Sequence, residues 1–237
     1  MQQSYGLARV MSKRGLCSRS EAEALIRAGR VQVLGRVVRD PENRTPIDAD
    51  IQIDAQIQAA SVARVYFALN KPRGLICSNS DERGRATVRA LFDGLDVPHL
   101  SPVGRLDQAS EGLLLMSNDS AWAAGITEPQ RKLQKIYHVQ VSKLPSASEL
   151  ERLRAGVQDS GEFLSAAAVQ ILRSGGKTAW LACTLVEGKN RQLRRMCAAI
   201  DAEVLRLIRV QIGPLVLGEL AKGTWRALTE TEVQLLR

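Results

Sequence analysis

Residues 104–119 read GRLDQASEGLLLMSND and carry the strongest local signal in the chain. Asp107 follows Arg105 and stands shortly before an apolar run over residues 112–116, a pattern typical of a buried strand. A side chain on the loop that enters a rigid strand is held in a defined place, as a nucleophile or general base requires. An aspartate before a strand is more often only a turn residue, whose carboxylate accepts hydrogen bonds from nearby backbone amides. Asp107 is therefore a candidate that needs partners elsewhere in the chain.

Composition narrows the class of protein. The chain has 237 residues, 45% hydrophobic and 4% aromatic, which suffices for a larger and a smaller domain with aliphatic cores. No segment approaches the roughly 20 apolar residues that cross a bilayer, and the N-terminal residues lack the order of a secretory signal. The four cysteines are scattered without CxxC spacing and the two histidines are far apart, so disulfide frameworks and metal sites are poorly supported. We expect a reduced, cytoplasmic protein without a metal.

The positive charge is concentrated near the N-terminus. The chain carries a net charge of +8, and residues 1–47 hold nine Lys/Arg against four Asp/Glu. A clustered basic region favours polyanions as partners and is a common footprint of nucleic-acid binding. The alternative is a merely well-solvated surface, which the concentration of charge disfavours.

The N-terminal part predicts two short helices followed by a small hairpin. The first helix ends at Gly15, and the second begins at Ser18, with Glu21 completing a capping box, and stops at Gly29. The run VQVLGRVV predicts a hairpin that turns at Leu34-Gly35, and IDADIQID predicts one more short strand.

This part of the sequence resembles a known module. The string LCSRSEAEALIRAGRVQVLGRVV resembles the alpha-L RNA-binding module of a small-subunit ribosomal protein, some tRNA synthetases and several RNA-modifying enzymes. The resemblance implies that residues 1–53 contact RNA mainly through phosphates and shape, so that binding weakens steeply with salt. The arginines that we expect to make these contacts are Arg14, Arg19, Arg27 and Arg30.

The rest of the chain predicts a linker and a larger module. Residues 54–64 are small, polar and aperiodic, as in a linker, and residues 65–237 follow as the larger module. Most of its segments resemble strands, with a hairpin turn at Gly175-Gly176 and a helix from Ser146 to Gly156. Mixed strands and helices without regular βαβ alternation indicate the α+β class, with a mixed, largely antiparallel sheet.

The segment KIYHVQVS offers an aromatic candidate. Tyr137 shares one strand face with Val139 and Val141. An aromatic side chain in a row of valines is usually part of the core. The functional alternative is a tyrosine that caps a pocket and stacks on a planar ligand.

The segment VEGKNRQLRRMCAAI offers cations. Lys189, Arg191, Arg194 and Arg195 crowd the first turns of a predicted helix, where positive charge opposes the helix dipole. This unfavourable placement indicates pairing with phosphates or with a buried carboxylate. A following strand, VLRLIRVQIG, brings two more arginines near an apolar face.

These segments together resemble the motifs of bacterial ribosomal-RNA pseudouridine synthases. The likeness runs in order through LNKPRG, GRLD with EGLLL, KIYHVQV, GKNRQLRRM and LRLIRVQIGPLVLGELAKGTWRALTETE, and it covers nearly the whole chain. The resemblance implies a pseudouridine synthase catalytic domain behind the RNA-binding module. It also implies an isomerisation without a cofactor, in line with the lack of a Gly-rich phosphate loop after a strand.

The resemblance assigns a role to each candidate. Asp107 is implied as the nucleophile, Arg194 as the cation that keeps it charged, and Tyr137 as the ring that stacks on the flipped uracil. Arg105 is implied to fill the gap left by the extruded nucleotide, and Leu207 to pack the base from its other side. The remaining substrate-binding cations are Lys189, Arg191 and Arg195.

Two other functions compete with this interpretation. One is a non-catalytic RNA-binding or ribosome-assembly protein on the same scaffold, which would have no need of Asp107, Tyr137 and Arg194 together. The other is a hydrolase, which usually requires a second carboxylate at a defined separation. We expect a monomer that modifies ribosomal RNA, with the large subunit favoured by the stretch LNKPRGLICSNSDERGRATV. The target uridine, and whether attack falls on its sugar or its base, are left open by the sequence.

Overall fold

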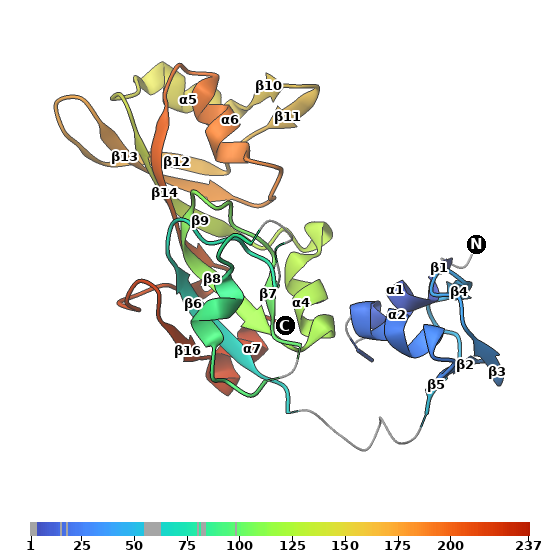
Figure 1. Ribbon diagram of the computed structural model, residues 1–237. Helices are drawn as coiled ribbons and strands as arrows, with labels where there is room; N and C mark the ends of the chain where they lie inside the picture. The colour runs from blue at the N-terminus through green and yellow to red at the C-terminus, as the bar shows by residue number, and fades with distance from the viewer. Residues whose placement is uncertain are drawn as a thin grey trace. The chain divides into compact units, whose positions relative to one another are not determined.

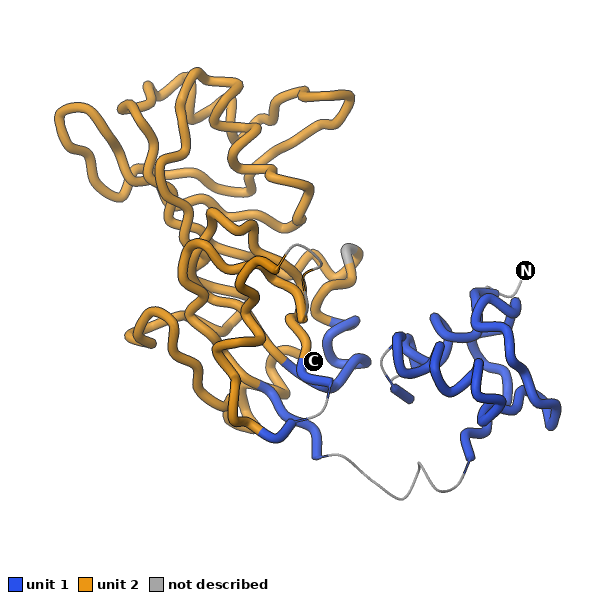
Figure 2. The backbone as a smooth tube through the Cα atoms, in the orientation of Figure 1, with its two compact units in different colours: residues 1–66, 96–100, 117–125 blue, residues 67–95, 101–116, 126–237 orange. Residues whose placement is uncertain are grey.

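The computed structural model describes residues 4–14, 16–17, 19–54, 63–79, 81, 84–97 and 99–237. The chain divides into two compact units, shown in different colours in Figure 2. Unit 1 comprises residues 1–66, 96–100 and 117–125, and unit 2 comprises residues 67–95, 101–116 and 126–237. The linker predicted over residues 54–64 lies for the most part outside the described residues, and the boundaries proposed from the sequence remain predictions.

The described residues between Ser4 and Asp54 form two helices and short strands around a small core (Figure 1). Strands β1 and β4 pair antiparallel, and β3, β2 and β5 form a three-stranded sheet. The core consists mainly of aliphatic side chains from α1 and α2, against which Ile51 and Ile53 pack. The elements are β1 (Ser4–Gly6), α1 (Leu7–Lys13), α2 (Arg19–Arg27), β2 (Val31–Val33), β3 (Arg36–Val38), β4 (Arg44–Pro46) and β5 (Ile51–Ile53).

The predicted turns of this part are confirmed where they are described. Leu34 and Gly35 have φ values of 50° and 75°, so both central residues of the β2–β3 hairpin have the positive φ that a tight type I′ turn requires. Gly29, with φ 73°, follows the end of α2 as predicted. The expected helix end at Gly15 and the cap at Ser18 lie outside the described residues.

A nine-stranded mixed sheet forms the centre of the larger part. Its main path runs β12-β13-β9-β14-β8-β6-β16, with β15 paired to β14 and β7 paired to β8. Strands β12, β13, β9 and β14 are antiparallel neighbours, whereas β14 and β8 run parallel. The predicted α+β class with a mixed, largely antiparallel sheet is confirmed. The strands are β6 (Tyr66–Lys71), β7 (Ser101–Val103), β8 (Glu111–Ser117), β9 (Lys135–Val141), β12 (Ala168–Ser174), β13 (Ala179–Leu185), β14 (Val204–Ile212), β15 (Leu215–Val216) and β16 (Trp225–Ala227).

Helices and one separate hairpin complete this part of the fold. Helix α5 has the predicted capping box of Ser146 and Glu149, and it ends at Gly156. A two-stranded hairpin, β10 (Val157–Asp159) with β11 (Glu162–Leu164), follows α5 directly. The helical elements are η1 (Val88–Phe92), α4 (Ser120–Thr127), η2 (Pro129–Arg131), α5 (Ala147–Ala155), α6 (Gln192–Ala198) and α7 (Glu230–Leu235). Among the described helices, none is long and apolar enough to cross a membrane.

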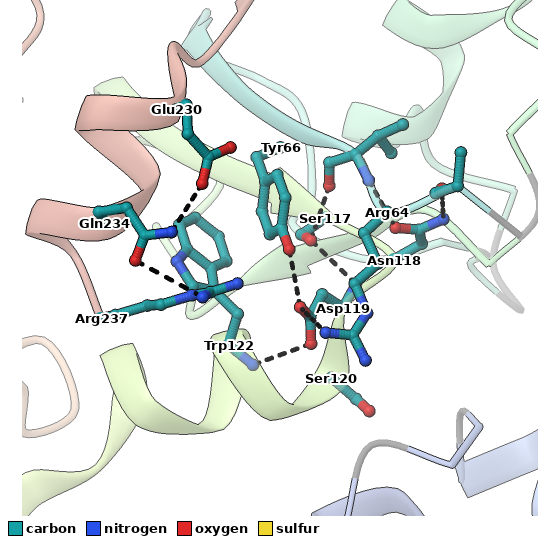
Figure 3. A network of polar contacts seen from close by, with 12 residues as sticks. Arg64, Tyr66, Ser117, Asn118, Asp119, Ser120, Trp122, Glu230, Gln234 and Arg237 are labelled. Carbon is teal, nitrogen blue, oxygen red and sulfur yellow. Dashed lines mark hydrogen bonds and ion pairs between the residues drawn. The ribbon is translucent and has the colours of Figure 1, made fainter.

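The last residues of the opening motif fix the end of β8 (Figure 3). Asp119 caps α4, because its Oδ1 accepts a hydrogen bond from the Trp122 amide at 3.0 Å. Its Oδ2 accepts a second bond from the Tyr66 hydroxyl at 2.8 Å. Burial opposes ionisation of this carboxyl, but these bonds and Arg64 outweigh it and lower the pKa of Asp119. The hydroxyl of Ser117 (labelled in Figure 3) donates to the Val65 carbonyl at 2.7 Å, so the end of β8 is tied to the start of β6.

Candidate active site

A cavity of about 560 Å³ opens beside Asp107, on the loop between β7 and β8. Strands β9 and β14 supply part of its wall, and the segment leading into α6 supplies another part. The predicted site residues that line it are Arg105, Asp107, Tyr137, Lys189, Arg191, Arg194 and Leu207. The structure thus brings together seven of the eight residues predicted for catalysis and substrate binding.

The loop that carries Asp107 is held by a buried lysine. Lys71, the lysine of LNKPRG, is fully enclosed, and burial lowers the pKa of its ammonium group. Its Nζ donates to the carbonyl oxygens of Ser110 at 2.8 Å, Pro72 at 3.1 Å and Asp107 at 3.2 Å. One cation therefore fixes the main chain of the loop at Asp107 and again at Ser110.

Further main-chain bonds add to this rigidity. The Gly74 amide donates to the Gln108 carbonyl at 2.8 Å, and the Gln108 side chain donates back to the Gly74 carbonyl at 3.0 Å. The Leu106 amide donates to the buried Cys77 sulfur at 3.3 Å. The Asp107 loop is therefore held against the segment LNKPRGLIC by these hydrogen bonds.

Gly112 is required by the close approach of β14. Its φ is 99°, and a Cβ atom there would lie 2.3 Å from the Arg209 carbonyl oxygen. Any larger residue would push β8 and β14 apart at their parallel contact, where Gly112 and Arg209 are register partners. The glycine of EGLLL thus sets the distance between the loop and the pocket wall.

The cation that pairs with Asp107 is Arg191 rather than Arg194. The Arg191 Nη1 atom lies 4.0 Å from the Asp107 Oδ2 atom, and the Asp107 side chain is 39% exposed. The Arg194 guanidinium instead donates to the Val204 carbonyl at 3.2 Å and to the Ala109 carbonyl at 3.4 Å. Among the described contacts Arg194, which lies within α6, reaches the loop backbone, whereas Arg191, which precedes the helix with φ 49°, pairs with the carboxylate. The expected partnership of Arg194 with Asp107 stays a prediction.

Arg194 is nevertheless coupled to the nucleophile candidate. Burial, followed by the charge of Arg191, lowers the pKa of Arg194, while the Asp107 carboxylate acts in the opposite direction. Its buried Nε atom has no hydrogen-bond partner among the described residues. Arg194 therefore contributes positive charge beneath the loop.

The remaining cations at the start of α6 have partners of their own. Arg195 does not line the cavity, because its guanidinium pairs with Asp159 and, at 2.6 Å, with Glu162 on the β10–β11 hairpin. Lys189 donates to the Phe163 carbonyl at 2.6 Å and lies 3.3 Å from the Glu187 carboxylate. These partners offset the unfavourable charge at the helix start, so Arg195 is a tether for the hairpin in this structure.

The pocket wall follows the sheet register. Tyr137 on β9 stands opposite Arg209 on β14, and Val139 stands opposite Leu207. Tyr137 is 8% exposed and Leu207 is 6% exposed. Tyr137 therefore belongs to the buried row that its valine neighbours predicted and lines the cavity as well.

A buried carboxylate near the loop was missed from the sequence. Glu111, 3% exposed, receives hydrogen bonds from Arg206 Nε at 2.7 Å and from Lys222 Nζ at 2.5 Å. The bond from Arg206 is the main reason that the pKa of Glu111 falls to about 2, against the effect of burial. Only the sequence string EGLLL pointed to this residue, without indicating its two partners.

The predicted RNA-binding arginines lie on the surface of the N-terminal part. Arg19 pairs with Glu23 and Glu42, Arg27 pairs with Glu23, and Arg30 pairs with Asp54. Arg14 donates to the Ala49 carbonyl at 2.5 Å. Two cations that the sequence reasoning did not single out, Arg9 and Lys13, lie over the Tyr5 ring, at 5.0 and 4.1 Å from its centroid.

Comparisons with known proteins agree with this architecture. Residues 65–199 match the RNA pseudouridylate synthase family model, and residues 6–44 match the S4 domain. Ribosomal large subunit pseudouridine synthase B of Bacillus subtilis is 35% identical over 98% of this chain and 95% of its own length. An uncharacterized RNA pseudouridine synthase of Mycobacterium tuberculosis is 37% identical over 96% of this chain and 91% of its own length.

A solved structure extends the agreement to three dimensions. The crystal structure of a pseudouridylate synthase superposes with a TM-score of 0.70 at 28% sequence identity, covering 98% of this chain and 99% of the other. The family match spans more than half of the chain, and the curated relatives cover nearly all of it. The chain belongs to the RNA pseudouridine synthase family, the isomerases that convert uridine in RNA to pseudouridine.

Proposed function

We propose that this protein isomerises a specific uridine of ribosomal RNA, with Asp107 as the nucleophile. The observation that carries the proposal is the placement of Asp107 on a loop held by Lys71, at the edge of a cavity that Tyr137 and Arg194 also line. A carboxylate that can attack a nucleotide and an aromatic ring that can stack on a base thus line one cavity.

The chemistry is an exchange of two bonds at the ribose. The Asp107 carboxylate forms a transient covalent bond to the target nucleotide, and the glycosidic bond between N1 of the uracil and C1′ breaks. The uracil rotates, a bond forms between its C5 atom and C1′, and the bond to Asp107 breaks, which regenerates the carboxylate. The hydrogen at C5 leaves as a proton and N1 gains a proton, so that the product is an isomer of the substrate. Tyr137 stacks on the uracil during the rotation, and Leu207 packs against its other side.

Each cation of the site has a separate role in this proposal. Arg191 pairs with the Asp107 carboxylate, Arg194 places a second positive charge near it, and Arg105, exposed at the rim, takes the place of the extruded nucleotide. Flipping a base costs a few kcal/mol and least in weakly paired RNA, so the target uridine lies in a loop or bulge. Lys189 holds the rim next to the β10–β11 hairpin, and Arg195 acts by positioning that hairpin rather than by touching RNA.

The test of the nucleophile separates binding from chemistry. Asp107→Asn is expected to bind unmodified ribosomal RNA as the wild type does and to release no C5 hydrogen. Asp201→Asn is the matched control, because this exposed aspartate has φ 55°, a conformation that asparagine adopts readily. Wild-type pseudouridine formation by Asp107→Asn would overturn the mechanism.

We propose the large ribosomal subunit as the source of the substrate. The support is the full-length relative from Bacillus subtilis, which is named for that subunit. Mapping pseudouridines in both ribosomal RNAs from cells with and without the gene tests the assignment. A missing pseudouridine in the large-subunit RNA is expected. A loss confined to the small-subunit RNA or to transfer RNA would contradict it.

The N-terminal module is proposed to deliver the RNA, with Arg14, Arg19, Arg27 and Arg30 as contacts. Three of them are paired with carboxylates in this structure, so RNA phosphates would have to replace those carboxylates as partners. We also propose that the enzyme acts as a monomer in the cytoplasm, on free RNA or on an assembly particle. Comparing activity on naked RNA and on isolated subunit precursors distinguishes these two substrates.

A further inference from the structure

The cavity holds more positive charge than its own carboxylates can neutralise. Its lining contains six Lys or Arg residues and three Asp or Glu residues. Two of the cations are accounted for, because Arg191 pairs with Asp107 and Lys189 pairs with Glu187. Of the others, Arg105 and Arg194 have roles in the proposed function, which leaves Lys135 and Arg209 without one.

Sheet register places Lys135 and Arg209 on either side of the tyrosine. Lys135 and Tyr137 are two residues apart on β9, so their side chains share the pocket face about 7 Å apart. Arg209 is the direct register partner of Tyr137 on β14. A base that stacks on Tyr137 thus has two cations beside it, whose positive charge suits the phosphate of a nucleotide rather than the neutral base.

Neither cation is neutralised within the described structure. Arg209 is 6% exposed, and its Nε donates to the Leu113 carbonyl at 2.7 Å, but its buried Nη2 has no partner among the described residues. Lys135 forms no ion pair with a described carboxylate, and Glu128, the third carboxylate of the lining, pairs with neither cation there. Burial and then the charge of Arg209 lower the pKa of Lys135. Such an arrangement is unfavourable in the empty pocket and becomes favourable when an anion enters.

We propose that Lys135 and Arg209 form a phosphate subsite for the RNA backbone at or next to the flipped uridine. Lys135 is half-buried and donates directly to a phosphodiester oxygen, whereas the enclosed Arg209 attracts the same phosphate from beneath. This inference rests on the proposed function and adds to it a second anchor, which fixes the sugar while the base is free to turn. Because the sugar stays in place, its C1′ atom remains within reach of the C5 atom of the rotated uracil.

The test uses single-turnover kinetics on a short synthetic RNA that carries the mapped uridine. Lys135→Gln is expected to raise the half-saturating enzyme concentration roughly tenfold or more, the effect of one charge-assisted hydrogen bond, with little change in the maximal rate. Its binding should also depend less on salt, with the log–log slope reduced by about 0.7. Lys132→Gln is the matched control, because this exposed lysine lies just before β9 and does not line the cavity. Lys135→Arg should restore most of the affinity.

A second arm changes the RNA and leaves the enzyme intact. Neutral methylphosphonate linkages are placed one at a time on either side of the uridine. At one position the neutral linkage should weaken RNA binding by the wild type as much as the Lys135→Gln substitution does. The same linkage should not weaken RNA binding by Lys135→Gln any further. Equal penalties in both enzymes at every position, or a Lys135→Gln variant that matches Lys132→Gln, would overturn the subsite. Absence of pseudouridine with wild-type enzyme on every RNA would instead refute the proposed function.

Discussion

The sharpest prediction concerns Lys71, whose ammonium group holds the Asp107 loop from within the protein. Lys71→Met keeps the length and the apolar part of the side chain and removes the donor. Among the described bonds, the carbonyls of Asp107 and Gln108 keep other donors, the amides of Ser110 and Gly74, whereas those of Pro72 and Ser110 lose theirs.

The loss of stability follows from the two carbonyls that lose their donor. Each buried carbonyl left unpaired costs about 1–3 kcal/mol, and the two together are partly offset because no ammonium group has to be buried. We expect a loss of about 3 kcal/mol, which lowers Tm by roughly 6–12 °C in a domain of this size. A loop displaced by about 1 Å would also reduce kcat about 100-fold.

Thermal unfolding measures the loss of stability. Pseudouridine formation, assayed well below the unfolding temperatures of the wild type and of Lys71→Met, measures the change in kcat. Lys132→Met is the control for loss of a lysine at an exposed position. A Lys71→Met variant with Tm within about 2 °C of the wild type and an unchanged kcat would refute the role of this lysine.

Three further predictions follow from the same geometry. Gly112→Ala should lower Tm by more than about 10 °C or prevent folding, because its Cβ meets main chain at 2.3 Å, whereas Gly176→Ala, with open space, should fold normally. Glu111, with a native pKa of about 2 against an ordinary 4.5, stabilises the fold above pH 4.5 and loses this effect as the pH falls toward 2. Urea titrations should therefore show Glu111→Gln less stable than wild type by up to about 3 kcal/mol near neutral pH, with the gap shrinking in acid; a pH-independent gap would contradict this. Arg195→Met should speed amide exchange in the β10–β11 hairpin about tenfold and leave β9 unchanged, and equal protection in both proteins would show that the tether is unimportant.

The sequence predicted most of the fold because local patterns agreed with one another. The strand pattern around Tyr137, the capping box of Ser146 and the turn at Leu34-Gly35 each have a local cause, and the structure confirms all three. The nucleophile candidate could also be predicted from the sequence, since Asp107 lies in a specific motif. Its surroundings in space depend on contacts between distant segments, which no local pattern contains.

The differences between the expected and the observed partners of the site residues arise from contacts between distant segments. Arg195 and Arg191 both occur in the same basic run, yet one pairs with the β10–β11 hairpin and the other with Asp107. Which cation meets which carboxylate depends on where the helix starts and how the hairpin packs. The role of Lys71 was likewise hidden, because its carbonyl partners lie up to 39 residues away in sequence.

The parallel contact between β8 and β14 has a consequence for the synthesis of the enzyme. Gly112 and Arg209 are neighbours in the sheet but lie 97 positions apart in the chain. A nascent polypeptide that has already produced the Asp107 loop still lacks the strand that supplies Leu207 and the cation next to Tyr137. Contacts of such long sequence separation form late. The pocket beside Asp107 is therefore completed only after β14 has been synthesised, and chains truncated before β14 should retain the RNA-binding module but lack this pocket.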